Sequence, residues 1–168
     1  MARSPSAGFP GAVVVTSPED RLAELGVALP GPYPPHDPLD AVVIYGGRMR
    51  TSGQLPRDHA GQLVHPGVLG AELTVAQGAE AARWCALNAL SVLRSALGSL
   101  DRIERVLTVL GFVASVPRFA EQPAVVDGAS RLFADVFGTA GRHSRSAIGV
   151  SALPRGGAVE IEVEVALR

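Results

Sequence analysis

Apolar residues recur at helical spacing between residues 75 and 97 and form one continuous stripe. Its members are Val75, Ala79, Ala82, Ala86, Leu87, Leu90 and Leu93. Thr74 precedes the stripe and Gln77 follows three residues later, which is the capping-box pattern of a helix start. Gly98 follows Leu97 and is the residue type that most often ends a helix. The pattern predicts a long helix over residues 75–97 with one face in a core.

Two further helices are predicted, one long and one short. The long one runs from about Pro123 to Phe137 and ends at Gly138. Its inward residues are Val125, Val126, Ala129, Leu132, Phe133 and Val136. The short one begins at residues 17–20, where a serine N-cap, a proline and two acidic residues follow one another. Gly26 is expected to end it.

Strand patterns occupy much of the remaining chain. Residues 42–45 and 48–51 are predicted strands, separated by a glycine pair at 46–47 that suits a tight turn. Residues 103–113 form a predicted strand that is almost entirely apolar from position 106 onward. Such a run is typical of a central strand covered on both faces. A short strand is also predicted at residues 62–64.

The last quarter of the chain predicts a hairpin. Its first strand runs from His143 to Val150, and residues 153–157 form the turn. In the second strand apolar and acidic residues alternate: Val159, Glu160, Ile161, Glu162, Val163, Glu164 and Val165. This alternation is typical of a half-buried strand with one polar face.

Arg145 opens the first of these strands, and Glu160 lies early in the second. The planar guanidinium of arginine fits a carboxylate with two parallel hydrogen bonds. Two neighbouring strands carrying these groups would make a pocket for a small organic acid. An ordinary surface arginine on a hairpin is the alternative interpretation.

The elements together predict an α+β fold, in which a mixed β-sheet carries two long helices on one face. Residues 17–168 are expected to form a single domain. Residues 1–16 are expected to be a flexible N-terminal segment, or to form a short peripheral strand through residues 13–15. Residues 30–38 are a predicted loop, because their five prolines remove hydrogen-bond donors. An apolar second face on the central strand would have to meet a ligand or another subunit, which favours an oligomer.

Composition narrows the function classes. The 168 residues carry a net charge of −1, which argues against electrostatic nucleic-acid binding. The chain has no apolar run of about 18 residues and no secretory signal pattern, so a cytoplasmic protein without membrane contact is expected.

Cys85 is the only cysteine and is predicted to be buried and inert. The four histidines lie in predicted loops without metal-ligand spacing, so neither a metal nor a cofactor is expected.

Several segments resemble one protein family in sequence and order. They are Thr51-Ser52-Gly53-Gln54-Leu55-Pro56, Ala86-Leu87-Asn88-Ala89-Leu90, Gly98-Ser99-Leu100-Asp101, Arg145-Ser146-Ala147-Ile148-Gly149-Val150, Leu153-Pro154 and Val159-Glu160-Ile161-Glu162. The family is the Rid family, also called YjgF-type or L-PSP-like proteins, and in particular its longer subgroup with an N-terminal helix. The resemblance implies a chorismate-mutase-like α+β fold and a homotrimer with a cleft at each subunit interface.

The resemblance also implies a chemistry. Active family members hydrolyse reactive 2-imino acids and their enamine tautomers to 2-oxo acids and ammonia, without metal or organic cofactor. Arg145 matches the arginine that holds the substrate carboxylate, and Glu160 matches the glutamate that places the attacking water. Ser52 and Gly53 match residues that line the cleft. The implied ligand is therefore a small 2-imino or 2-oxo carboxylic acid.

Three positions depart from the family pattern. The family tyrosine corresponds either to Tyr33, returned to the cleft by a proline-rich insertion, or by ungapped counting to Leu39. Gly149 replaces a frequent glutamate, and Asp127 replaces a frequent asparagine of the subgroup. These departures support a second hypothesis, a non-catalytic trimer that binds a small carboxylate metabolite. An endoribonuclease is a third hypothesis, disfavoured because the chain has neither a basic stripe nor a catalytic histidine pair.

Overall fold

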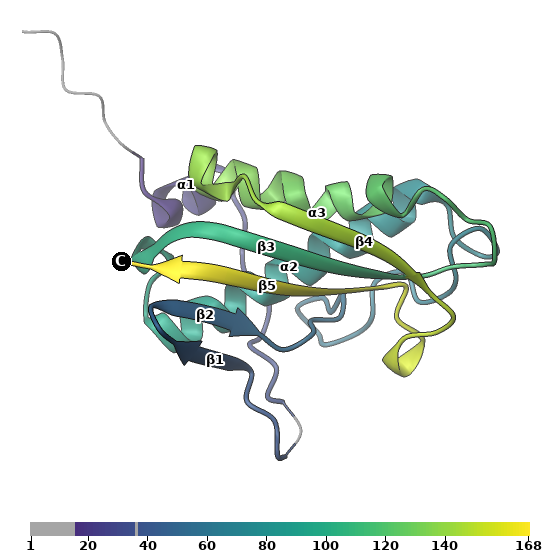
Figure 1. Ribbon diagram of the computed structural model, residues 1–168, viewed down its shortest axis with the longest axis horizontal. Helices are drawn as coiled ribbons and strands as arrows, with labels where there is room; N and C mark the ends of the chain where they lie inside the picture. Colours follow the sequence, from purple (N-terminus) through teal and green to yellow (C-terminus); the bar gives the residue numbers. More distant parts are fainter. Residues whose placement is uncertain (1–15, 36) are drawn as a thin grey trace, which may run out of the picture.

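The computed structural model of the protein describes residues 16–35 and 37–168 (Figure 1). The helices are α1 (Pro18–Glu24), α2 (Val75–Leu97) and α3 (Gln122–Phe137), and the strands are β1 (Val42–Tyr45), β2 (Arg48–Thr51), β3 (Ile103–Ala114), β4 (Ser144–Val150) and β5 (Val159–Leu167). The expected flexible segment or peripheral strand lies outside the described residues, apart from Thr16. No helix of the described residues is long and apolar enough to cross a membrane.

The predicted helix boundaries are confirmed because local capping groups define them. Ser17 accepts a hydrogen bond from the backbone of Asp20, whose side chain accepts one from Ser17 in return. Thr74 and Gln77 form the same reciprocal pair at the start of α2. Gly98 ends α2 in the left-handed conformation at a φ of 82°, which glycine adopts without steric penalty. The six predicted inward residues of α3 are all fully buried.

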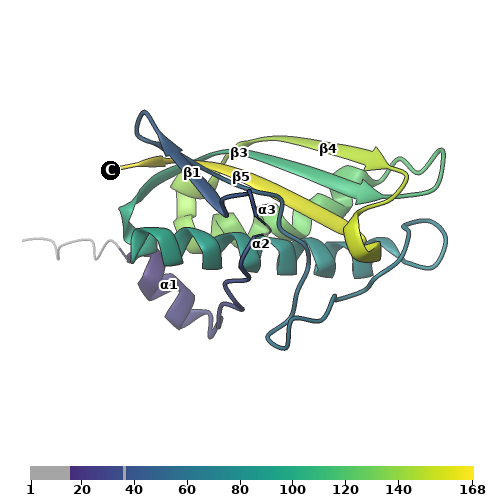
Figure 2. The same ribbon diagram turned by 90° about the horizontal axis from the view of Figure 1, so that it is seen from below.

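The sheet has five strands in the order β1-β2-β5-β3-β4. β3 and β4 are parallel, and the other neighbouring pairs are antiparallel. Both α2 and α3 pack on the same face of the sheet, as Figure 2 shows. The predicted α+β fold with a mixed sheet and two long helices on one face is therefore confirmed.

The predicted C-terminal hairpin is wrong. β4 and β5 are not paired with each other, because β3 lies between them (Figure 1). Every second side chain of β5, from Val159 to Val165, is buried, which suits a place inside the sheet. β4 has no buried residue and forms the sheet edge. The burial that β5 gains in the centre outweighs the local tendency of consecutive strands to pair.

The prediction for β3 is correct in position but wrong in burial. The strand is central, since β5 and β4 pair with its two sides. Its residues nevertheless alternate: Val106, Val109 and Val113 are buried beneath the helices, whereas Leu110 and Phe112 are only half-buried. The opposite face of the sheet is therefore open in the single chain, and its apolar side chains are available to another surface.

The predicted strand at residues 62–64 is not formed. Leu63 makes a single β-bridge to Arg57, and the Val64 amide donates to the Pro56 carbonyl over 2.8 Å. These bonds instead close a compact loop between β2 and α2. The loop brings residues 56–58 close to the proline-rich segment, where a cavity lies.

Candidate functional site

A cavity of about 270 Å³ lies among the proline-rich loop, the chain after β2 and the start of β5. Its lining residues are Tyr33, Pro34, Pro35, Leu39, Ala41, Ser52, Gly53, Gln54, Leu55, Arg57, Pro154, Arg155 and Glu160. We call it the Glu160 cavity. It brings together four of the five predicted site residues, namely Tyr33, Ser52, Gly53 and Glu160. Arg145 is the one that does not line it.

Gly53 and Glu160 face each other at the wall of this cavity. Gln54 and Ile161 exchange two backbone hydrogen bonds of 2.9 and 3.1 Å, which align the segment after β2 with β5. A Cβ atom on Gly53 would overlap the Glu160 carboxylate. Glycine at this position therefore leaves the space that the carboxylate occupies.

The Glu160 carboxyl is half-buried, and burial raises its pKa above the ordinary value of 4.5. The negative charge of Glu162 on the same strand raises the pKa further. A carboxylate with a raised pKa is a stronger proton acceptor than an exposed glutamate. Glu160 can therefore act as a general base toward a water molecule in the cavity.

Ser52 and Tyr33 both connect the cavity walls through hydrogen bonds. The Ser52 hydroxyl donates to the Asp40 carbonyl over 2.6 Å, which joins β2 to the end of the proline-rich loop. The Tyr33 hydroxyl donates to the Asp58 carbonyl, which joins the same loop to the segment after β2. Leu39 lines the cavity as well, so both candidates for the family tyrosine position reach this wall.

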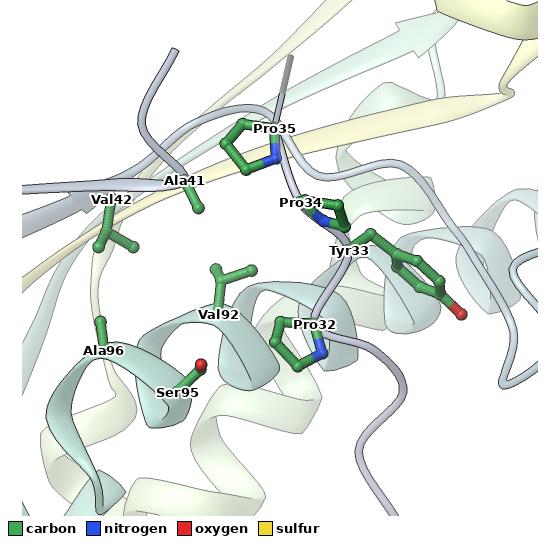
Figure 3. A pocket seen from close by; sticks show the side chains of 9 residues that line it. All are labelled: Pro32, Tyr33, Pro34, Pro35, Ala41, Val42, Val92, Ser95 and Ala96. Carbon is green, nitrogen blue, oxygen red and sulfur yellow. The ribbon is translucent and has the colours of Figure 1, made fainter. Parts of the chain in front are cut away.

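A second cavity of about 270 Å³ lies between the proline-rich loop and α2 (Figure 3). The two share Tyr33, Pro34, Pro35 and Ala41. Val92, Ser95 and Ala96 of α2 form its floor, and its lining contains no charged residue among those described. The hydroxyls of Tyr33 and Ser95 are its side-chain polar groups, so it is a largely apolar hollow beneath the loop.

Two arginines of the Glu160 cavity were not predicted as site residues. The Arg57 guanidinium lies 5.4 Å from the centre of the Tyr33 ring, and Arg155 lies in the turn before β5. The signal that could have identified Arg57 is its position directly after the Ser-Gly-Gln-Leu-Pro motif. Sequence reasoning missed it because the predicted strand at 62–64 gave no reason to fold this segment back over the cavity.

Arg145 lies instead against α3. Its Nη1 donates to the Asp127 carboxylate over 2.8 Å and to the Ser130 hydroxyl over 2.9 Å, and its Nη2 donates to the Pro123 carbonyl over 3.2 Å. Ser130 is in turn 3.0 Å from Nε2 of His143. Burial and the nearby Arg145 charge lower the pKa of His143, although its bond to the Gly141 carbonyl opposes this. A neutral His143 beside Ser130 is thus favoured.

Arg145 and Glu160 lie on opposite faces of the sheet. Arg145 pairs with Val109 of β3, and Glu160 pairs with Phe112 of the same strand. These partners are three residues apart, so their side chains point to opposite faces. Strand spacings place the two Cα atoms roughly 14 Å apart, about 10 Å along the strands and about 10 Å across them. One small molecule cannot contact both side chains within a single chain.

Among the described residues, no group of three or more histidine, cysteine, aspartate and glutamate side chains is arranged to hold a metal ion. His65 is paired with Glu80 over 2.7 Å, and the His59 ring packs edge-on against Trp84. In the Glu160 cavity the Glu160 carboxylate can accept a proton, and the arginine side chains can bind an anion.

Comparisons with known proteins agree with this architecture. A model of the family described as "YjgF/chorismate_mutase-like, putative endoribonuclease" matches residues 19–159. Protein TCP17 of Trypanosoma cruzi is 46% identical over 147 residues, which cover 87% of this chain and 91% of that protein.

Two solved structures are similar over almost their whole length. Atu1372 of Agrobacterium tumefaciens, a protein of unknown function, aligns with a TM-score of 0.82 and 41% identity over 90% of this chain and 93% of that one. A "putative endoribonuclease" of Shewanella oneidensis aligns with a TM-score of 0.86 and 34% identity over 90% of this chain and 99% of that one.

Proposed function

Because the chain belongs to the YjgF/chorismate mutase-like family, we propose that it hydrolyses reactive 2-imino acids and their enamine tautomers to 2-oxo acids and ammonia. The family predicted from the sequence motifs is thereby confirmed, and the activity is our proposal. The observation that carries it is Glu160, a half-buried carboxylate with a raised pKa on the wall of a cavity of about 270 Å³. Such a group is suited to activate water beside a small acid.

The proposed reaction needs one positioned water molecule and one proton acceptor. Carbon 2 of a protonated imine is already electrophilic, so water adds to it while Glu160 accepts the water proton. Glu160 then returns the proton to nitrogen and accepts the remaining hydroxyl proton as the carbon–nitrogen bond breaks, so that the 2-oxo acid and ammonia form. Ammonia takes up that last proton and leaves as ammonium, and Glu160 is again ionised. General base catalysis of this kind contributes about 10²–10⁴-fold in rate.

Arg145 would take part from a neighbouring subunit, since it cannot reach Glu160 within one chain. Its guanidinium has five N–H groups, of which the bonds to Asp127, Ser130 and Pro123 use three. The two remaining N–H groups can donate charge-assisted hydrogen bonds to a substrate carboxylate. The edge position of β4 supports this arrangement, and the active form that we propose is a homotrimer. A cytoplasmic location stays a prediction.

The test is a coupled assay in which an amino-acid oxidase generates 2-iminopropanoate and semicarbazide traps what remains. We expect the protein to shorten the lifetime of the imine. Glu160→Gln should lower kcat by about 10²–10³-fold with little change in KM, because the base acts in the transition state. Arg145→Gln should mainly raise KM.

Matched controls make the result decisive. Glu104→Gln alters an exposed glutamate at the start of β3 and should leave the rate unchanged. Retained activity in both Glu160→Gln and Arg145→Gln would refute the proposal, provided that circular dichroism shows both variants folded.

A specific observation favours a non-catalytic carboxylate-binding protein as the second candidate. The Tyr33 hydroxyl donates to the Asp58 carbonyl and Leu39 has no hydroxyl, so neither candidate for the family tyrosine position offers a phenol proton to a substrate. Under this hypothesis 2-oxo acids would raise the melting temperature in an Arg145-dependent way, and no imine would be hydrolysed.

The family description and the Shewanella relative also name an endoribonuclease. With a net charge of −1 this chain is poorly suited to hold RNA, and a purified preparation should leave RNA intact.

A further inference from the structure

Arg57 and Arg155 give the Glu160 cavity more positive charge than a monocarboxylate requires. Glu160 is the one acidic residue among the described residues that line it. The proposed reaction assigns the carboxylate at carbon 1 of the substrate to Arg145 of a neighbouring subunit. Two cationic side chains on the cavity wall are then left without a role in binding a simple imino acid.

Arg57 is held in place by contacts from three parts of the chain. Its guanidinium lies over the Tyr33 ring at 5.4 Å, and its Nη1 donates to the Gly61 carbonyl over 3.4 Å. Asn88, a side chain of α2 that is only 2% exposed, donates to the Arg57 carbonyl over 2.8 Å. A cation fixed before the ligand arrives loses little conformational freedom on binding, which favours affinity.

The Asn88 contact shows that the position of Arg57 is built into the core. Asn88 is one of only three polar residues that are fully buried among those described, and its amide also donates to the Trp84 carbonyl over 2.8 Å. The Tyr33 hydroxyl holds the next carbonyl, that of Asp58. The backbone that follows the Arg57 side chain is therefore fixed relative to the cavity.

Arg155 reaches the cavity from a backbone conformation that favours glycine. Its φ is 59° and its ψ is 14°, in the left-handed region. Glycine adopts this conformation without steric penalty, and glycines follow directly at 156 and 157. The turn nevertheless presents an arginine to the cavity, which adds a second cation at its mouth.

We infer that the Glu160 cavity selects 2-imino acids that carry a second carboxylate, such as those formed by oxidation of acidic amino acids, with Arg57 as the principal specificity-determining residue and Arg155 as the second. The inference rests on the proposed function, which assigns the imine carbon to Glu160. The second carboxylate would bind the Arg57 guanidinium through charge-assisted hydrogen bonds. Apolar side chains of the wall, such as Leu39 and Leu55, would contact the intervening methylene groups.

The first experiment compares two imines of equal chain length, 2-iminoglutarate and 2-iminopentanoate, generated from glutamate and norvaline by amino-acid oxidases. We expect kcat/KM to be at least tenfold higher for the dicarboxylate. Arg57→Gln should lower kcat/KM for the dicarboxylate about tenfold, because a hydrogen bond to a charged group is lost. The value for the monocarboxylate should stay within about twofold.

Two further variants give the comparison its controls. Arg155→Gln should reduce the same preference less than Arg57→Gln, because Arg155 is exposed to water. Arg131→Gln removes the same charge from an exposed position on α3 and should leave both substrates unaffected. Equal kcat/KM values for the two imines in the unmodified protein would overturn the inference while leaving the deaminase proposal standing.

Binding of products tests the inference independently of turnover. Titration calorimetry with 2-oxoglutarate and 2-oxopentanoate should give tighter binding of the dicarboxylate, and Arg57→Gln should remove most of that difference. If no imine is hydrolysed but this Arg57-dependent preference is found, the deaminase proposal fails and the dicarboxylate selectivity stands. An equal loss of affinity for both oxo acids in Arg57→Gln would overturn the selectivity.

Discussion

Nη1 of Arg145 lies 2.8 Å from Oδ1 of Asp127 and forms an ion pair that joins β4 to α3. The arginine that the family resemblance assigns to the substrate is thus already neutralised in the single chain. A substrate carboxylate must either displace Asp127 or bind the N–H groups that Asp127 does not use. The side chain of Asp127 is 43% exposed, so water can solvate its carboxylate when the ion pair with Arg145 breaks.

Replacing Asp127 by asparagine should strengthen carboxylate binding. Asp127→Asn keeps the shape of the side chain but removes the charge that competes for Arg145. We expect KM for 2-iminopropanoate to fall about three- to tenfold, measured in the oxidase-coupled assay. The free energy of unfolding should change by no more than about 1 kcal/mol, because partly exposed ion pairs contribute little. Asp135→Asn, on the exposed side of α3, is the control; a raised KM in Asp127→Asn alone would show that the aspartate orients the arginine instead.

The raised pKa of Glu160 predicts an acid limb in the pH–rate profile. The base must be ionised to accept a proton, so kcat/KM should fall as the pH drops through the pKa of Glu160. Burial and the charge of Glu162 raise that pKa above 4.5, and the limb should lie correspondingly higher than for an exposed glutamate. Glu162→Gln should move the limb to lower pH, because it removes a nearby negative charge. A limb that Glu162→Gln does not move would contradict this assignment.

The raised pKa of Glu160 also predicts how the stability of the folded protein depends on pH. The folded protein binds the Glu160 proton more tightly than the unfolded chain, so stability falls as the pH rises through the raised pKa. Glu160→Gln removes this loss and should be at least as stable as the unmodified protein at pH 7. Below the ordinary pKa of glutamate both states are protonated, and the difference should disappear. Thermal unfolding of both proteins at a series of pH values measures it; a less stable variant at pH 7 would contradict the prediction.

Gly53→Ala should impair catalysis while the chain still folds. The new methyl group would meet the flexible end of Glu160, which can rotate away, so we expect a stability change within about 1 kcal/mol. The displaced carboxylate should lower kcat by about tenfold or more. In a Glu160→Gln background the same substitution should have no further effect, because its action passes through Glu160. Additive losses in the double variant would exclude this mechanism.

Cys85 should resist alkylation in the folded protein. Its thiol is fully buried and donates to the Val159 carbonyl over 3.3 Å. Burial, and to a lesser degree the charge of Glu160, raise its pKa well above the usual value, so the reactive thiolate is scarce. Iodoacetamide at pH 8 should leave the native protein unmodified over hours and label it completely in guanidinium chloride, as mass spectrometry would show. Rapid labelling of a protein with a native circular dichroism spectrum would contradict the predicted burial.

Local signals in the sequence were sufficient to predict the helices and the first two strands. The capping boxes at Ser17 and Thr74 and the glycine at 98 act within a few residues, so their effect can be read directly from neighbouring positions. The same holds for the turn at residues 46–47, which joins β1 to β2 in the predicted register. The motif residues Ser52, Gly53 and Glu160 each match a short family segment, and the structure places all three at one cavity. Their roles in binding and catalysis stay predictions.

Only the tertiary structure decided how these candidates are arranged. Pairing of β5 with β2 and β3, instead of with β4, depends on the burial of whole strands and on partners more than 40 residues apart in the chain. That choice places Arg145 and Glu160 on opposite faces and makes a neighbouring subunit necessary for a shared site. Arg57 enters the cavity because Asn88, on a distant helix, holds its carbonyl. Neither relationship is encoded in local spacing, since both follow from long-range packing of the completed sheet and helices.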